Sequence, residues 1–133
     1  MRTTTLLTIS AVAALALGAG TAAATTMHPE LGARLSGMGQ HGIVNLTLKA
    51  KTHDICWTFD IPTKGATHAS IRDANAMVVA KLGSAYSKKG CAMAPAAAVT
   101  KIESHPTKYR VWVDTKQHTG ELRGVLFVGM AHM

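Results

Sequence analysis

Hydrophobic and polar residues alternate one by one along much of the chain, as they do in strands that bury one face. The strands predicted in this way are 44–49, 55–61, 77–82, 109–114 and 122–128. Pro62 ends the second of them, because proline has no N–H to donate to a neighbouring strand. The pattern therefore predicts a series of short strands rather than a helical protein.

One helix is predicted, from 95 to about 104. Pro95 suits its first turn, and the pair His105-Pro106 ends it. The polar segment 115–120, which ends in glycine, predicts a hairpin connection between the last two strands. Short, regularly spaced strands with one short helix predict an all-β fold, an antiparallel Greek-key sandwich or barrel of immunoglobulin-like type.

The first residues have the pattern of an export signal, here placed at 1–24. Arg2 precedes an apolar stretch from Leu6 to Leu17, and Ala22-Ala23-Ala24 provides a small-residue cleavage site. The alternative is an uncleaved anchor, since about 20 apolar residues span a bilayer. The remaining predicted segments are a lead-in at 25–32, a β domain at 33–129 and a tail at 130–133.

Two cysteines, Cys56 and Cys91, agree with export, because disulfides persist in oxidising compartments. A bridge between them would stabilise the fold by about 4 kcal/mol in the chain-entropy account. The alternatives are two buried thiols or a metal-binding pair, and the spacing matches no usual zinc pattern. We predict the disulfide and expect it to tie the two halves of the strand-built shell together.

The chain is basic and small. Its 133 residues and 14.0 kDa exclude a multidomain enzyme and a polytopic membrane protein. Fourteen Lys and Arg against seven Asp and Glu give a net charge of +7, which favours an anionic polymer or lipid of the cell envelope as partner. The expected contributors are Lys49, Lys51, Lys88, Lys89, Lys108 and Lys116. The alternative is that these lysines only keep the domain soluble.

Two stretches near the C-terminus resemble a known family. Residues 109–115 (YRVWVDT) and 120–126 (GELRGVL) resemble the C-terminal signature of the CHRD (chordin-type) domain. Residues 55–61 and 66–72 stand in the order of weaker landmarks of that family. The resemblance covers about 33–128 and is closest to secreted, single-domain bacterial members.

The resemblance implies a secreted β-rich domain, with a superoxide-dismutase-like strand arrangement, and structural rather than catalytic residues. The matching positions are Trp57, Tyr109, Val111, Val113, Thr115, Gly120, Glu121, Arg123 and Gly124. Trp57 and Phe59 are expected in the core with the two valines. Glu121 and Arg123 are expected to lock the hairpin, through an ion pair or through hydrogen bonds to the turn backbone.

Candidate chemistry is sparse. The chain has no Gly-x-Ser-x-Gly motif, few acids and a cysteine pair expected to be bonded, so we predict no enzyme and no catalytic residue. Seven histidines make a copper or zinc site the alternative. Its ligands would be His68, Asp114 and His118, with His53 or His105 as a fourth. Where the family has His-Ile-His this chain has Ser70-Ile71-Arg72, so the family's histidines cannot be carried over.

The leading hypothesis is a secreted CHRD-like structural or binding module of the cell envelope, without a cofactor and with an unknown ligand. Its expected partner is an anionic envelope polymer or a protein. Nucleic acid is not expected, because the chain lacks a stripe of basic and aromatic residues. The alternative is a secreted metal-binding module. Either would act in the periplasm, the cell wall or the medium, with no membrane span after signal cleavage.

Overall fold

The computed structural model describes residues 30–62 and 64–132, so the predicted signal peptide and residues 25–29 of the lead-in lie outside the described residues. The described part forms one eight-stranded antiparallel sheet with the order β5-β4-β7-β8-β1-β2-β3-β6. The strands are β1 (Glu30–Gly37), β2 (Gln40–Lys49), β3 (Asp54–Asp60), β4 (Ala66–Arg72), β5 (Val78–Lys81), β6 (Lys89–Met93), β7 (Arg110–Thr115) and β8 (Leu122–Val128).

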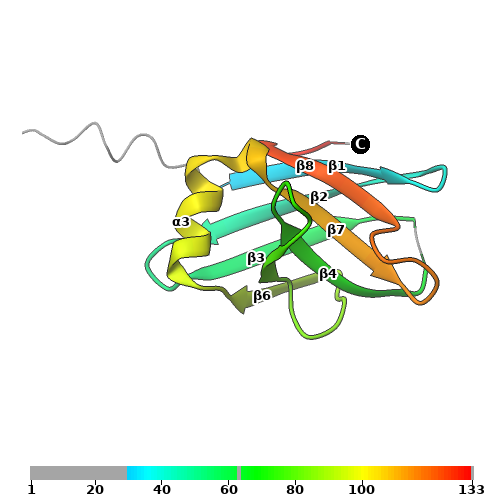
Figure 1. Cartoon of the computed structure of the whole chain (residues 1–133), viewed down its shortest axis with the longest axis horizontal. Coiled ribbons are helices and arrows are strands. Elements are labelled where there is room, and N and C mark those ends of the chain that lie inside the picture. The colour runs from blue at the N-terminus through cyan, green and yellow to red at the C-terminus, as the bar shows by residue number, and fades with distance from the viewer. Residues whose placement is uncertain (1–29, 63, 133) are drawn as a thin grey trace, which may run out of the picture.

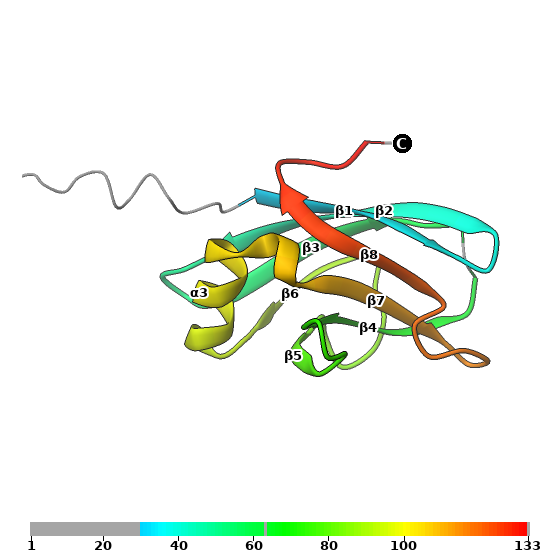
Figure 2. The same ribbon diagram turned by 45° about the horizontal axis from the view of Figure 1, so that its top comes forward.

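The sheet curls into a flattened barrel that is not quite closed. Strands β5, β4, β7 and β8 form one layer, and β1, β2, β3 and β6 lie behind them (Figures 1 and 2). The chain passes between the layers after β3, after β5 and after β6, as in a Greek key. The prediction of an all-β barrel or sandwich with one short helix is confirmed.

The core follows the alternation seen in the sequence. On β3, Ile55, Trp57 and Phe59 are buried, while the residues between them face outward. Val111 and Val113 of β7 are fully buried in the same cluster, as expected. The indole Nε1 of Trp57 donates to the carbonyl of Ser87 at 2.9 Å, which satisfies the polar atom of this core tryptophan.

The predicted helix is α3 (Ala96–Ser104), which follows Pro95 directly. Val99 and Ile102 point from it into the core, so the helix closes one end of the barrel. A short 3-10 helix, η2 (Pro106–Lys108), then leads into β7. No helix in 30–62 or 64–132 is long and apolar enough to cross a membrane.

Three strands, β1, β4 and β6, were not among those predicted from the pattern. β1 begins at Glu30, inside the expected lead-in, and Gly32 and Ala33 hide its pattern because small residues carry little hydrophobic signal. β6 lies between the predicted strand 77–82 and the predicted helix, where the pattern indicated no strand. Its inward residues are Gly90 and Ala92, opposite Trp57 and Ile55, so the larger partners on β3 supply the apolar area.

The disulfide between Cys56 and Cys91 is present, and the prediction of the bond is confirmed. The two cysteines are direct register partners on β3 and β6, with Cα atoms 3.9 Å apart. The expectation that the bond ties two halves together is wrong, because it joins neighbouring strands of one layer. Both cysteines lie on the outward face, since their neighbours along the strands point inward.

Candidate functional site

All four arginines of the described chain lie on the outer surface of adjacent strands. They are Arg34 on β1, Arg72 on β4, Arg110 on β7 and Arg123 on β8. The sheet order places β4, β7, β8 and β1 side by side, so residues far apart in sequence form one surface. We call this set of four residues the arginine face.

Trp112 lies at the centre of this surface. It points outward from β7, opposite Ser70 on β4 and Arg123 on β8. The guanidinium carbons of Arg72 and Arg123 lie 4.2 and 3.9 Å from its ring centroid, which leaves the side chain only 8% exposed. Two cation–π contacts therefore bury an outward-facing tryptophan beneath two charged groups.

Hydrogen bonds hold both stacked arginines in place. Arg72 donates through Nε to Ser70 Oγ at 3.3 Å and through Nη1 to the Ala76 carbonyl at 3.1 Å. Arg123 donates through Nε to the Gly120 carbonyl at 3.1 Å. Each guanidinium keeps unused N–H donors, so the pair is a preorganised set of charged donors.

The positive charge of this surface is not neutralised. Within residues 30–62 and 64–132, none of the four arginines forms an ion pair with a carboxylate. Arg72 and Arg110 are even register partners, an arrangement that is unfavourable for like charges. The nearby carboxylate of Asp73 binds the backbone of the β4–β5 turn instead, because its Oδ1 accepts from the N–H groups of Asn75 and Met77.

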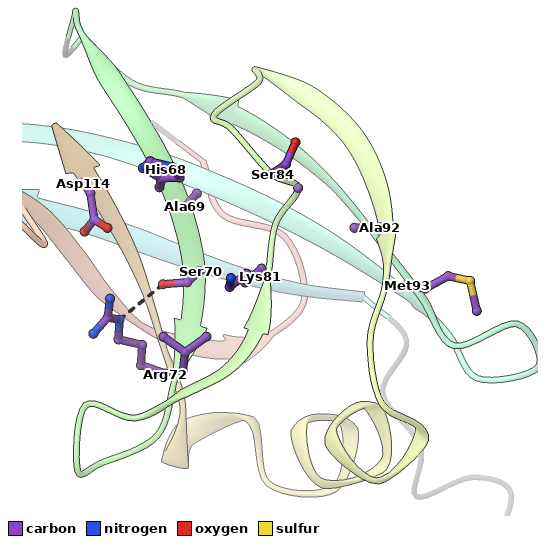
Figure 3. A pocket seen from close by; sticks show the side chains of 11 residues that line it. His68, Ala69, Ser70, Arg72, Lys81, Ser84, Ala92, Met93 and Asp114 are labelled. Carbon is purple, nitrogen blue, oxygen red and sulfur yellow. Dashed lines mark hydrogen bonds between the residues drawn. The ribbon is translucent and has the colours of Figure 1, made fainter. Parts of the chain in front are cut away.

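A cleft of about 540 Å³ opens beside the arginine face, at the seam where β5 and β6 fail to pair. We call it the seam cleft. Figure 3 shows its two sides: Arg72, Ser70 and Lys81 lie on β4 and β5, and Ala92 and Met93 lie across the seam on β6. Arg72 thus belongs both to the cleft and to the arginine face.

The predicted metal ligands are only partly brought together. His68 and Asp114 are register partners on β4 and β7, and both line the seam cleft. His118 lies in the β7–β8 connection and lines a different pocket, with Lys64 and Glu121. The described residues contain no group of three or more His, Cys, Asp or Glu side chains that could hold a metal ion.

His53 and His105, the suggested fourth ligands, lie in the β2–β3 turn and at the end of α3. Neither lines the seam cleft. Asp114 binds the backbone of the β7–β8 connection, since its Oδ1 accepts from the Gly120 N–H at 2.6 Å. The copper or zinc alternative therefore receives no support from the arrangement of these residues.

Arg123 and Glu121, the two residues expected to lock the hairpin, bind different partners. Arg123 bonds the turn carbonyl of Gly120, which is the contact expected of it. Glu121 instead accepts from the Thr115 hydroxyl, with 3.0 Å between Thr115 Oγ1 and Glu121 Oε1. The structure holds no ion pair between Glu121 and Arg123.

The lysines expected to bind an anion do not gather on one surface. Lys49 and Lys51 lie at the β2–β3 turn. The end of β6 near this turn is Met93, and Lys89 lies at the other end of that strand. Lys108 ends η2, and Lys116 lies in the β7–β8 connection. The sequence signal for the arginine face was the outward position of each arginine in its strand, but only the strand order brings the four together.

Comparison with known proteins adds no identification: no family model, no curated protein and no solved structure matches this chain.

Proposed function

We propose that the protein is a non-catalytic, extracytoplasmic binding module that recognises an anionic component of the cell envelope through the arginine face. The observation that carries this proposal is the segregation of all four described arginines on one surface without carboxylate partners. Guanidinium groups bind phosphate and carboxylate in pairs of parallel hydrogen bonds, which ammonium groups cannot do.

The location is part of the proposal. The export signal expected at 1–24 supports it, and so does the disulfide, since such bonds persist outside the cytosol. The resemblance of 109–126 to the CHRD signature agrees with a secreted binding domain. Mass spectrometry of the exported protein tests this part: it should begin at Thr25 and gain mass on reduction and alkylation of Cys56 and Cys91.

Titration with long-chain inorganic polyphosphate tests the arginine face, because this probe presents anionic groups without other chemistry. Replacing all four arginines with glutamine should weaken binding at least tenfold and make it less dependent on salt, since fewer counterions are released. The matched control replaces Lys49, Lys51, Lys88 and Lys89 with glutamine, which removes the same charge elsewhere. Equal weakening in both variants would mean that net charge alone attracts the polymer, and the proposal would be wrong.

A milder variant keeps the test decisive if the fourfold variant unfolds. Arg110 is exposed and makes no hydrogen bond or ion pair in the described structure, so Arg110→Gln leaves the Trp112 stack intact. It should still weaken polyphosphate binding, whereas Lys108→Gln, two residues earlier and also exposed, should weaken it less. A larger effect of the lysine variant would contradict the assignment.

A further inference from the structure

We propose that the seam cleft binds the apolar tail of an anionic amphiphile whose charged group is held by the arginine face. This inference rests on the proposed function and adds the chemical class of the ligand: a single anionic group, such as a phosphate monoester, on an alkyl chain. The argument starts from the way the barrel fails to close.

The seam reaches the barrel interior through small side chains. Ala69 of β4 is paired with Val113, and Ala92 of β6 is paired with Ile55, so both alanines point toward the core. Gly83 and Ser84 line the same cleft from the loop that follows β5. Where larger residues would close the barrel, these small residues leave the seam cleft open; we call the part of the cleft between Ala69 and Ala92 the slot.

The rim of the slot is apolar and adaptable. Met93, on the β6 side, is 74% exposed, and Val78, on the β5 side, is 44% exposed. Met77, next to Val78, is 64% exposed. Large apolar side chains this exposed gain by covering each other or a ligand, and methionine adapts its shape to apolar partners.

One side of the slot carries the positive charge. Lys81 and Arg72 lie beside it on β5 and β4, and His68 lies farther along β4 (Figure 3). Asp114 is the acid in the lining, and its Oδ1 accepts the Gly120 N–H. A ligand that suits this arrangement has an anionic head at Arg72 and Lys81 and an apolar tail directed toward Ala92 and Met93.

A strand from another chain suits the seam less well. All neighbouring strands are antiparallel, so in an eight-strand order β5 and β6 run in opposite directions. One inserted strand would be antiparallel to one edge and parallel to the other. The seam is also short, because the loop 82–88 crosses one end and α3 lies at the other (Figure 3). An alkyl tail needs no backbone partners and has finite length.

The test is a series of ethyl, butyl, hexyl and octyl phosphate, each below its micelle concentration, with binding followed by NMR. Affinity should rise about fourfold for each methylene that enters the slot and then level off when the slot is full. Amide shifts should spread from Arg72 and Lys81 to Ala69 and Ala92 as the tail lengthens. Octyltrimethylammonium, with the same tail and the opposite charge, should bind more weakly than octyl phosphate.

Ser84→Trp should remove the dependence on chain length, because the indole would fill the slot from the exposed loop. Ser104→Trp is the matched control, since Ser104 is exposed at the end of α3 and outside the cleft. If Ser84→Trp does not fold, the spread of shifts in the unmodified protein decides the question.

Three results would overturn the inference. Equal affinity for ethyl and octyl phosphate, with polyphosphate still bound at the arginines, would reject the tail site and leave the proposed function standing. Failure of every phosphate compound to bind would reject both. A concentration-dependent dimer, with shifts at β5 and β6 in the absence of ligand, would show that a second copy of the chain occupies the seam.

Discussion

At the scale of single residues, the environment of a side chain in this protein depends on its neighbours across the sheet more than on its own position in a pattern. Trp112 stands at an outward position of β7, yet Arg72 and Arg123 cover it. Asp114, a candidate metal ligand in the sequence, instead accepts a backbone N–H from Gly120. In both cases the partner lies on another strand or across a turn, so local sequence does not reveal it.

Gly124 gives a prediction at this scale. Its missing Cβ would press against the backbone carbonyl of Arg34, where β8 passes β1. Because backbone on both sides is fixed by strand pairing, Gly124→Ala should lower the free energy of unfolding by about 3 kcal/mol, at the upper end of overpacking costs.

Urea unfolding followed by circular dichroism would measure this loss. Gly39→Ala is the control: Gly39 has φ 75° but no atom near its missing Cβ, so it should cost only the conformational strain of about 1 kcal/mol. A Gly124→Ala variant no less stable than Gly39→Ala would show that β8 and β1 separate easily.

At the scale of elements, a strand can be predicted where large apolar side chains alternate with polar ones along the sequence. A strand whose inward residues are small lacks this pattern and cannot be predicted from it. β3 and β8 could be placed from their sequences because large apolar side chains repeat along them. β6 could not, since its inward residues are glycine and alanine. Its place at the edge of the sheet is held by one partner strand and by the Cys56–Cys91 bond.

Replacing both cysteines with alanine should therefore destabilise the protein, by up to about 4 kcal/mol for a separation of 35 residues. The loss should be greatest locally at β6, whose only ladder in the described structure is with β3. Urea unfolding measures the total, and amide hydrogen exchange should show faster opening of β6 than of β2. A loss under about 1 kcal/mol, with β6 still protected, would mean that strand pairing alone holds it.

At the scale of the whole molecule, the segment 82–88 connects the two layers across one end of the seam. The N–H of Tyr86 donates to the Thr67 carbonyl, and the N–H of Phe59 donates to the Lys88 carbonyl. The Tyr86 ring lies against Phe59, with 5.3 Å between ring centroids. Partial burial raises the pKa of the Tyr86 hydroxyl above its ordinary value of 10.0.

This direction predicts a loss of stability in alkali. Below pH 10 Tyr86 is neutral in the folded and the unfolded state, so its full contribution to stability is present. Above pH 10 the unfolded chain loses the Tyr86 proton first. The free energy of unfolding therefore falls until the pH passes the raised pKa of the folded state. Urea unfolding at about pH 9 and about pH 11 would measure the fall. Tyr86→Phe should reduce it. The same fall in the variant and in the unmodified protein would show that other groups cause it.

The sequence by itself determined that this is an all-β protein with one short helix and a disulfide, because alternation, proline positions and cysteine count are local properties of the chain. It also indicated the core residues Trp57, Phe59, Val111 and Val113. Only the tertiary structure decided which outward residues are neighbours. The arginine face and the seam cleft exist because residues separated by tens of positions lie on adjacent or facing strands, and strand order is fixed by packing of the whole barrel.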